Sequence, residues 1–348
     1  MDYNRWRFPF MHNGRFANHP GENLNRAFWK SVRSYFSLLF AKEKHNHEEL
    51  AQWIASSQEA SLDAAQESLE PQIIWIGHST FLIRIGGVTI LTDPIFDTLR
   101  YILSFKRLLP PGIPLKSLPK IDVILISHNH PDHMDKTTLL FLKKRDNPLI
   151  LVPYGDKKWF DKRQFERVKE FMWWDQTKIG DVNLTFLPSI HWSQRSVLDH
   201  NKSLWGAWMI EELKGTMTRL FFAGDTAYGT HFKALADAYT RVDLALMPIG
   251  PTSPHELQHC SHLSAEDAGR AFVDINAHYL VPMHWGTYRL GTEAPLQPIR
   301  QLTRWWKEHA HILKEKGLLY LKVGQVMGIN PQLRNTAFAQ TTELIQGL

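Results

Sequence analysis

Residues 122–135 read DVILISHNHPDHMD, an apolar run followed at once by a cluster of polar side chains. Residues 123–126 lack the polar alternation of a half-exposed strand, which predicts a strand buried on both faces. Four potential metal ligands follow within six residues, namely His128, His130, Asp132 and His133. They would lie at the carboxyl end of the strand, where open α/β sheets place their sites. Imidazole and carboxylate groups together suit zinc, iron or manganese.

The alternative is a polar loop that happens to be rich in histidine. A packed loop has little reason to crowd three imidazoles and a carboxylate, because each buried polar group needs a partner. The spacing is the HxHxDH signature of the metallo-β-lactamase superfamily, and the chain resembles that superfamily here. Redox enzymes on the same fold carry Glu at the position of Asn129. The amide therefore resembles the hydrolases of the superfamily rather than its oxygen and nitric-oxide reductases.

The composition is that of a globular protein of 348 residues, with 43% hydrophobic and 22% charged residues. This length can bury one large core, or one domain plus an extension. The net charge of +5 and the pI of about 9.1 are compatible with an anionic substrate or an anionic membrane face. The charge is too diffuse to predict a nucleic-acid partner.

Signals for a particular compartment are few. Cys260 is the single cysteine, so no internal disulfide is possible. The N-terminal sequence MDYNRWRFPF lacks the basic start and apolar run of a signal peptide. No apolar stretch approaches the ~20 residues that a transmembrane helix requires. We therefore expect a cytoplasmic protein, soluble or peripheral on the membrane.

Residues 1–70 are predicted to form an N-terminal arm with an amphipathic helical extension. Residues 1–21 suggest an irregular arm, and residues 48–69 resemble a surface helix. Residues 28–40 predict a helix with bulky aromatics on one face and cations beside them. This face could contact a membrane interface through Phe28, Trp29 and Phe36, or it could pack on the catalytic domain.

Residues 71–328 are predicted to form the catalytic domain, and residues 329–348 a polar tail. Predicted strands cover residues 73–76, 81–85, 88–91, 123–126, 149–152, 182–187, 204–211, 219–223, 244–247, 279–282 and 318–324. Predicted helices cover 137–144, 264–275 and 297–316, and residues 98–118 read as a loop near the site. Gly86-Gly87 predicts a tight hairpin, and a second hairpin is expected around Gly215. Strand pairs followed by helices favour an α/β fold, an αββα sandwich of two mixed sheets packed between helices.

A centre with two metals needs about eight ligand contacts, including a bridging carboxylate and a bridging hydroxide. Candidates of the right type stand at the ends of predicted strands. The first metal would be held by His128, His130 and His191, the second by Asp132, His133 and His284, with Asp225 as the bridge. The superfamily resemblance implies the same assignment. A structural role in the core is the alternative for His191, Asp225 and His284.

Two further residues are expected around these ligands. Asp93 in the sequence TDP would accept a hydrogen bond from a ligand imidazole and fix its tautomer, or it would cap a helix. His78 in GHST would orient a ligand or line the site, or it would be a plain turn residue. Two divalent cations, taken as Zn²⁺ with Fe or Mn as alternatives, would lower the pKa of a bridging water from 15.7 to roughly 7. The resulting hydroxide would attack the substrate, and Asp132 or a metal-bound water would protonate the leaving group.

Several longer motifs resemble the family of N-acyl-phosphatidylethanolamine phospholipase D. They are LTDPIF (91–96), LPKIDVILISHNHPDH (118–133), PSIHWSQR (188–195), LWGAW (204–208), FFAGDTAY (221–228), QHCSHLSAEDA (258–268) and MHWGT (283–287). The resemblance covers residues 71–325 and implies a zinc hydrolase that releases phosphatidic acid and an N-acylethanolamine from an N-acylated phospholipid. It also implies that His262 lies near the substrate. The chain departs from the animal enzymes at Pro131, where they have a Tyr that touches the substrate.

Two alternatives to a phospholipase D-type phosphodiesterase stay open. The first is a metal-dependent hydrolase of a soluble sugar-phosphate lactone or cyclic phosphate, since related lactonases share much of the metal frame. The second is a binding or scaffold protein without activity, although all seven ligand candidates are intact. The expected partner is a phospholipid or another phosphodiester substrate. Family members often dimerise, so a homodimer is possible, but the sequence has no interface signature.

Overall fold

The computed structural model describes residues 3–21, 47–54, 70–100, 104–254 and 258–329. The predicted helix over residues 28–40, with Phe28, Trp29 and Phe36, lies outside the described residues. So do most of the predicted helix over 48–69 and the tail from residue 330 onward. Among the helices that are described, none is both long and apolar enough to cross a bilayer.

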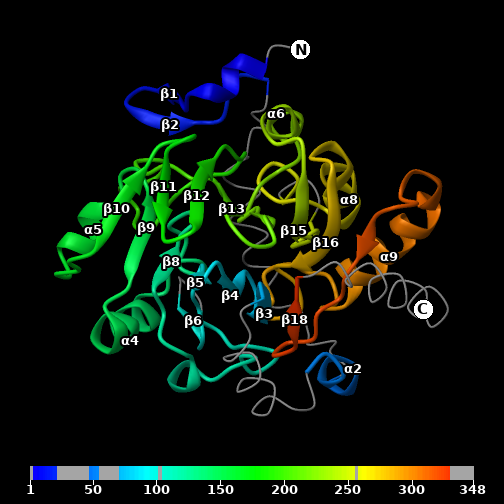
Figure 1. Ribbon diagram of the computed structural model, residues 1–348, viewed down its shortest axis with the longest axis horizontal. Helices are drawn as coiled ribbons and strands as arrows, with labels where there is room; N and C mark the ends of the chain where they lie inside the picture. The colour runs from blue at the N-terminus through cyan, green and yellow to red at the C-terminus, as the bar shows by residue number, and fades with distance from the viewer. Residues whose placement is uncertain (1–2, 22–46, 55–69, 101–103, 255–257, 330–348) are drawn as a thin grey trace.

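Two seven-stranded mixed sheets form the centre of the molecule (Figure 1). The first has the order β10-β9-β8-β5-β4-β3-β18, and the second the order β11-β12-β13-β14-β15-β16-β17. The first sheet contains β3 (Gln72–Gly77), β4 (Thr80–Ile85), β5 (Val88–Thr92), β8 (Val123–Leu125), β9 (Leu149–Pro153), β10 (Val168–Phe171) and β18 (Val326–Gly328). The second contains β11 (Gln176–Ile179), β12 (Val182–Leu187), β13 (Ala207–Glu212), β14 (Arg219–Phe222), β15 (Val242–Pro248), β16 (Ala277–Met283) and β17 (Gly317–Leu318).

Helices lie on both outer sides of this pair of sheets. Helices α4 (Lys136–Asp146) and α5 (Lys157–Asp161) lie beside the first sheet, and α8 (Ala265–Asp274) and α9 (Gln297–Glu308) beside the second (Figure 1). Shorter pieces are α2 (His47–Ala51), α6 (His231–Ala238), the strands β6 (Leu99–Arg100) and β7 (Ser104–Phe105), and the 3-10 turns η2 (Leu115–Ser117) and η3 (Ala310–Ile312). The predicted αββα sandwich of two mixed sheets is confirmed.

Strand β8 shows why its sequence is apolar without alternation. Val123 and Leu125 face the core between the two sheets, whereas Ile124 and Ile126 face a second core on the outer side of the first sheet. All four side chains are buried, with at most 1% of the surface exposed. Burying one such side chain contributes roughly 1.5–3 kcal/mol, so neither face tolerates a polar residue. The predicted strand buried on both faces is confirmed.

The two predicted hairpins are also confirmed. Strands β4 and β5 pair with Ile85 opposite Val88, so Gly86 and Gly87 form a two-residue turn. Their φ angles of +54° and +74° match a type I′ turn, which residues with a side chain rarely adopt. Strands β13 and β14 pair antiparallel around the turn that contains Gly215.

The strand directions bring functional loops to one edge. In the first sheet β3 and β5 are each antiparallel to β4, and β5, β8 and β9 run parallel. In the second sheet β12 and β14 are each antiparallel to β13, and β14, β15 and β16 run parallel. The carboxyl ends of β3, β5 and β8 therefore share one edge, as do those of β12, β14 and β16.

Direct contacts join these two edges. The indole Nε1 of Trp208 donates to the carbonyl of Ile126 at 2.9 Å, and the amide of Gly206 donates to the carbonyl of Ser127 at 3.0 Å. Gly224, with φ +58°, lies so close to Ser127 that a Cβ there would come within 2.5 Å of the Ser127 Cβ. The loop after β8 is thereby fixed against the loop after β14.

The N-terminal arm is more ordered than its sequence suggested. Residues 3–21 form a 3-10 turn, η1 (Tyr3–Arg7), and a hairpin of β1 (Phe10–His12) and β2 (Arg15–Ala17), so the irregular arm predicted for residues 1–21 is wrong. The overlooked signal is Asn13-Gly14, whose φ angles of +50° and +70° form a tight turn. Trp6 and Phe16 are buried in the main core. The proposed domain limits at residues 70/71 and 328/329 stay a prediction.

Three further elements differ from the predictions. The described part of the helix predicted over 48–69 ends at Ala51, since Ile54 bridges to Val323 and Trp53 packs against Trp285. The helix predicted over 297–316 ends at Glu308. The strand predicted over 318–324 keeps only Leu318, because the chain then crosses to the other sheet and forms β18. Leu319, Tyr320, Leu321 and Val323 are buried in this crossing segment, which explains why it is largely apolar, whereas Lys322 is exposed.

Replacing Gly224 by alanine tests the contact between the two sheet edges. The new Cβ would meet Ser127 and would also force a left-handed backbone on a residue with a side chain. We expect Gly224→Ala to lower the free energy of unfolding by about 2–5 kcal/mol in urea titrations of the metal-free protein. Gly87→Ala is the control, since it has φ +74° but nothing within 4 Å, and should lose only about 1–2 kcal/mol. Equal losses in both variants would disprove the close contact.

Candidate metal centre

The structure brings all seven predicted ligands together at the shared edge of the two sheets. The first sheet supplies the loop after β8, which carries His128, His130, Asp132 and His133. The second sheet supplies the other three, His191 after β12, Asp225 after β14 and His284 after β16. Each of these ligands thus lies in the loop that directly follows the carboxyl end of a strand.

Three histidines form the first group. His128 Nε2 lies 2.8 Å from His130 Nδ1, and His191 Nε2 lies 3.3 Å from the same atom. The other ring nitrogen of His191 lies 2.7 Å from the carbonyl of Ser261. Because a carbonyl only accepts, His191 Nδ1 carries the proton and Nε2 presents a lone pair to the group. The side chain of Asn18, in the N-terminal arm, donates to the backbone carbonyl of His191 at 3.0 Å.

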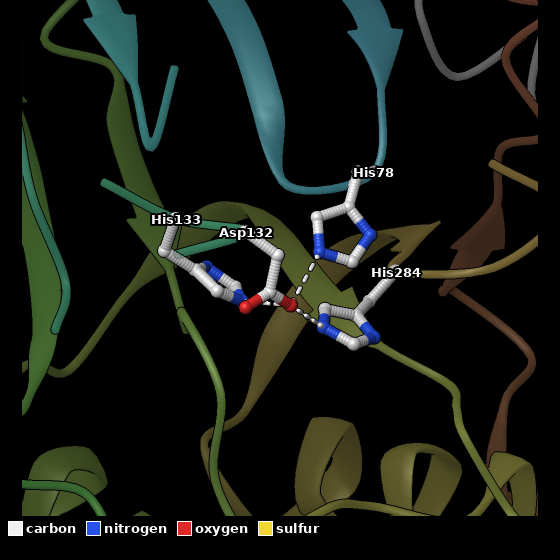
Figure 2. A group of neighbouring side chains, drawn as sticks. All are labelled: His78, Asp132, His133 and His284. Atoms are coloured by element: carbon white, nitrogen blue, oxygen red, sulfur yellow. Dashed lines mark hydrogen bonds and ion pairs between the residues drawn. The ribbon is translucent and has the colours of Figure 1, made fainter. Parts of the chain in front are cut away.

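The second group surrounds the carboxylate of Asp132 (Figure 2). Asp132 Oδ2 lies 3.1 Å from His78 Nε2, 3.4 Å from His133 Nε2 and 3.8 Å from His284 Nε2. Figure 2 shows the three imidazoles converging on this carboxylate from separate segments of the chain. His78 belongs to the turn between β3 and β4, which lies in the first sheet, whereas His284 follows β16 of the second sheet.

Asp225 lies between the two groups. Its Oδ2 atom is 3.3 Å from His133 Nε2, 3.2 Å from His284 Nε2 and 3.9 Å from His191 Nε2. The side chain is buried, with 1% exposed, and neither carboxylate oxygen has a hydrogen bond within the described residues. This is the position that a bridging carboxylate would occupy.

The donor atoms fit a pair of divalent cations. Tetrahedral zinc with bonds of about 2.0–2.1 Å holds its donors about 3.3 Å apart, close to the separations measured here. His133 Nε2, His284 Nε2 and both Asp225 oxygens are buried without a hydrogen bond in the described part of the chain. Buried polar atoms are normally paired, so a set of orphaned nitrogens and oxygens that face one another indicates ligands for a cation.

Asp93 occupies the place that the sequence predicted beside the ligands. Its Oδ2 atom accepts from His133 Nδ1 at 2.7 Å, which leaves His133 Nε2 for the cluster. Ser127 binds Asp93 through both its amide and its hydroxyl, and the same hydroxyl lies 2.9 Å from His128 Nδ1. No helix of the described chain begins at Asp93, so the helix-capping alternative is wrong.

His78 is more than a turn residue. It adopts φ +56°, an unfavourable value for a residue with a side chain, and is 1% exposed. The carbonyl of His78 accepts from the amide of His284, at 3.2 Å, and its own amide donates to Thr287 Oγ1 at 2.7 Å. His284 is also left-handed, with φ +63°. The two strained histidines therefore hold one another in place.

Burial and mutual charge set the protonation of these groups. Burial lowers the pKa of His128 and His130 well below 6.5, and the neighbouring histidines lower it further, so both rings are neutral and able to bind a cation. Burial alone would raise the pKa of Asp132 and Asp225, but the neighbouring imidazoles together outweigh it and hold both below their usual range. They are His133 and His78 at Asp132, and His133 and His284 at Asp225. Both carboxylates are ionised in the folded chain.

Solvent reaches the cluster mainly at Asp132 and His262. The side chains of Asp132 and His262 are 15% and 12% exposed, whereas those of His133, His191, Asp225 and His284 are at most 1% exposed. His262 Nδ1 lies 3.5 Å from Asp225 Oδ2, just before helix α8. A pocket of about 30 Å³ adjoins His284 and is lined by Trp285, Tyr288, Arg289 and Glu293 among others.

Near the metal loop the structure shows contacts of Asn129, Asp156 and Arg195 that the sequence did not predict. The side chain of Asn129 turns to Asp156, donating to Oδ1 at 2.8 Å, rather than to the cluster. Burial raises the pKa of Asp156 to about 7, although Ser203, Asn129 and Arg195 oppose the rise. The guanidinium of Arg195 donates to the carbonyls of Asn129 and Met134. Arg195 stands in the motif HWSQR, but its partners are distant in sequence and no local signal identifies them.

Comparison with known proteins identifies relatives of the chain. The sequence model of the Beta-lactamase superfamily domain matches residues 88–285. A Saccharomyces cerevisiae protein named N-acyl-phosphatidylethanolamine-hydrolyzing phospholipase D, mitochondrial, is 33% identical over 242 residues, which cover 66% of this chain and 50% of that protein. The Caenorhabditis elegans N-acyl-phosphatidylethanolamine-hydrolyzing phospholipase D 1 is 30% identical over 268 residues, covering 72% of this chain and 74% of that protein. The chain thus spans about half the length of the yeast relative.

A solved structure is similar in fold. Igni18, a metallo hydrolase from the archaeon Ignicoccus hospitalis, superposes with a TM-score of 0.57 at 19% sequence identity. The match covers 75% of this chain and 98% of that one. At this level of identity the likeness concerns the arrangement of the two sheets and their helices.

The raised pKa of Asp156 predicts a pH-dependent stability. The folded chain keeps this carboxyl protonated up to about pH 7, whereas the unfolded chain ionises it near pH 3.8, so stability through this group falls as the pH rises between these values. Asp156→Asn should therefore gain about 2–3 kcal/mol over the parent chain between pH 5 and pH 8. Urea denaturation of both metal-free proteins at the two pH values measures this difference. A difference that stays constant between the two pH values would contradict the assignment.

Proposed function

Because the chain belongs to the metallo-β-lactamase superfamily of metal-dependent hydrolases, we propose that it is a dinuclear zinc hydrolase that cleaves a phosphodiester. The observation that carries the proposal is the set of seven facing side chains, with Asp225 between the two groups. The substrate that we propose is an N-acyl-phosphatidylethanolamine or a related glycerophosphodiester. It is supported by the names of the yeast and nematode relatives and by the motifs shared across residues 71–325.

The residues around the cluster have separable roles in this proposal. The first zinc would be held by His128, His130 and His191, and the second by Asp132, His133 and His284, with Asp225 shared between them. Zinc bound there would supply an activated water as the nucleophile and positive charge for the phosphoryl oxygens. Asp93 and Ser127 keep the ligand rings of His133 and His128 in the tautomers that face the cluster.

The substrate would approach on the solvent side, past Asp132 and His262. Asp132 is the more exposed of the two cluster carboxylates. Because it is ionised, it would accept the proton that the attacking water loses and then pass that proton to the oxygen of the leaving alcohol. His262 lies beside Asp225 at this entrance and would bind a phosphoryl oxygen of the substrate. Neither role requires a serine or cysteine nucleophile.

The pocket beside His284 supports a second candidate function. It is small, at about 30 Å³, and its lining includes the charged residues Arg289 and Glu293. This volume is about that of one water molecule, so the pocket can hold one small polar group, which a compact substrate such as a sugar-phosphate lactone or a cyclic phosphate would offer and an acyl chain would not. The lipid proposal therefore places the acyl chains outside this pocket.

The proposed reaction is tested with vesicles that contain N-acyl-phosphatidylethanolamine. The zinc-loaded protein should release N-acylethanolamine and phosphatidic acid, and Asp225→Ala should lower the rate by about 10³-fold or more, because the two cation sites lose their shared ligand. Asp181→Ala, on the surface hairpin, is the control and should keep the parent rate. Metal content is determined for each variant by elemental analysis, with about two ions per parent chain expected.

Two outcomes would count against the proposal. Product formation by the parent protein no faster than by Asp225→Ala would exclude N-acyl-phosphatidylethanolamine as the substrate. Turnover of a cyclic phosphate or a phosphorylated lactone in the same preparation would then favour the second candidate. Near-normal turnover by Asp225→Ala with full metal content would exclude the bridging role of Asp225.

If the substrate is a lipid, the protein must contact a membrane, and the loop over residues 193–201 is the described segment that we propose for this contact. The loop is closed at its base by two hydrogen bonds between Ser193 and Asn201, and Asp199 accepts the amides of Arg195 and Ser196. Its tip carries Val197 and Leu198, which are 91% and 77% exposed. Rigid exposed apolar residues of this kind are typical of interaction surfaces.

The surroundings of this tip favour a phospholipid bilayer as the partner. Arg15 donates to the carbonyl of His200, and the exposed Lys202 follows the loop, so cations accompany the apolar tip. The ring of His200 lies 5.7 Å from that of Trp192, which in turn packs on His130 at 4.2 Å. The tip would thus insert next to the metal centre, where an extracted lipid headgroup must arrive.

Replacing both tip residues by serine tests this contact. We expect Val197→Ser/Leu198→Ser to bind anionic phospholipid vesicles at least about tenfold more weakly, because the apolar area that enters the bilayer is lost. Hydrolysis of a soluble aryl phosphodiester should be unchanged. Met217→Ser, at a hairpin turn where Met217 is 54% exposed, is the control and should bind vesicles as the parent does. Unchanged vesicle binding by the double variant would exclude the tip as the contact.

A further inference from the structure

We propose that Arg195 is a positioning residue that clamps the metal-binding loop over residues 128–134 in its ligating shape. The inference rests on the proposed metal centre but not on the identity of the substrate. It assigns a role to a cation that lies four residues after the ligand His191 and whose described guanidinium contacts are with two carbonyls and one indole rather than with a ligand side chain.

The clamp consists of two hydrogen bonds from one nitrogen. Arg195 Nη1 donates to the carbonyl of Asn129 at 2.9 Å and to the carbonyl of Met134 at 2.8 Å. These carbonyls stand on either side of His130, Asp132 and His133 in the chain. A single guanidinium nitrogen, with its two hydrogens, therefore fixes the span of loop that carries three of the seven ligands.

The loop needs such support because its own backbone bonding is limited. The amides of His133 and Met134 both donate to the carbonyl of His130, which forms one tight turn. Pro131 has no amide hydrogen to contribute. Ligand nitrogens that must converge to within a few tenths of an ångström therefore depend on contacts from outside the loop.

A second anchor acts on the same segment from the side of helix α5. Asn129 Nδ2 donates to Asp156 Oδ1, and Asp156 immediately precedes the helix. The guanidinium of Arg195 also lies over the indole of Trp159 in α5, 5.0 Å from the ring centroid. The planar guanidinium is thus held by its face while its edge bonds the loop, an arrangement that a lysine ammonium does not reproduce.

The clamp couples the two sheets of the molecule. Arg195 and His191 belong to one segment, which leaves β12 of the second sheet, whereas the clamped loop leaves β8 of the first sheet. A shift of this segment would move His191, a ligand of the first metal. It would also release the loop that carries Asp132 and His133, ligands of the second metal. We therefore expect the loss of Arg195 to weaken metal binding rather than simply to lower stability.

Arg163 provides a matched control. It also lies over the ring of Trp159, at 3.9 Å from the centroid, and it donates to the carbonyl of Trp159 at 2.8 Å. Both arginines thus share the same aromatic partner, but the side-chain hydrogen bond of Arg163 stays within its own segment. Replacing either arginine by methionine removes a guanidinium from the ring of Trp159, but only Arg195→Met also removes the hydrogen bonds of the clamp.

The experiment compares Arg195→Met with Arg163→Met in two measurements. Competition between the metal-free proteins and a chromophoric chelator gives the affinity for Zn²⁺. We expect affinity to fall about 10–100-fold in Arg195→Met and to stay within about threefold of the parent in Arg163→Met. Hydrogen exchange in the metal-free proteins should be faster over residues 128–134 in Arg195→Met alone. Arg195→Lys, which keeps a donor, should give intermediate values in both.

The two measurements separate the possible failures. Parent-like zinc affinity and parent-like exchange in Arg195→Met would overturn the clamp. Equal losses in both methionine variants would also overturn it, because the effect would then come from Trp159 packing. If Arg195→Met does not fold, Arg195→Lys decides, and parent-like behaviour in both assays would reject the proposal. A parent protein that binds no zinc would instead count against the proposed function, while the exchange measurement would still decide on the clamp.

Discussion

The meeting of two sheet edges at the buried carboxylate of Asp225 is the constraint on which the rest of the structure depends. A carboxylate with 1% of its side chain exposed requires positive charge nearby, and the chain supplies imidazoles from loops of both sheets at 3.2–3.9 Å. Those loops reach Asp225 only because β3, β5 and β8 end at one edge and β12, β14 and β16 end at the facing edge. The contacts of Ser127 with Gly206 and Gly224 fix the two edges against each other. The packing of the two sheets therefore determines the geometry of the site, since a shift of one sheet against the other would separate the donor atoms.

Much of this arrangement could be predicted from the sequence, because the signals are local. The apolar run over residues 123–126 and the Gly86-Gly87 turn each reflect the immediate backbone environment, and each formed as expected. The predicted ligands each follow the end of a strand, so once the strands were placed the ligands came together. Asp93 likewise lies beside His133, as expected. What failed were elements determined by distant contacts. Apart from Lys322, residues 319–323 are as apolar as a buried strand, but their backbone crosses from one sheet to the other. Asp156 and Arg195 received no role, since Asn129 lies 27 residues from Asp156 and the two carbonyls that Arg195 binds lie 61 and 66 residues from it.

The distribution of exposure in the site bears on its chemistry. Ligand rings such as His133 and His284 are shielded, so water cannot compete for their lone pairs, whereas Asp132 and His262 remain accessible. A site of this kind admits a substrate oxygen while keeping the donor atoms dry. The small pocket beside His284 and the exposed loop tip at Val197 and Leu198 then offer two different surroundings for the rest of a substrate. The first has room for one small polar group, and the second is apolar and open, so the two proposed substrate classes would make different contacts around the same metal centre.

The hydrogen bond from Asn18 to the carbonyl of His191 has a practical consequence for anyone who trims this protein. A shortened version starting at β3 would keep every predicted ligand and both sheets, and nothing in the sequence motifs would argue against it. It would nevertheless uncover the indole of Trp173, which now packs on Trp6, and remove the bond that restrains the backbone of a ligand histidine. Residues 3–21 thus support the backbone of the segment that carries His191, and a shortened protein should retain them.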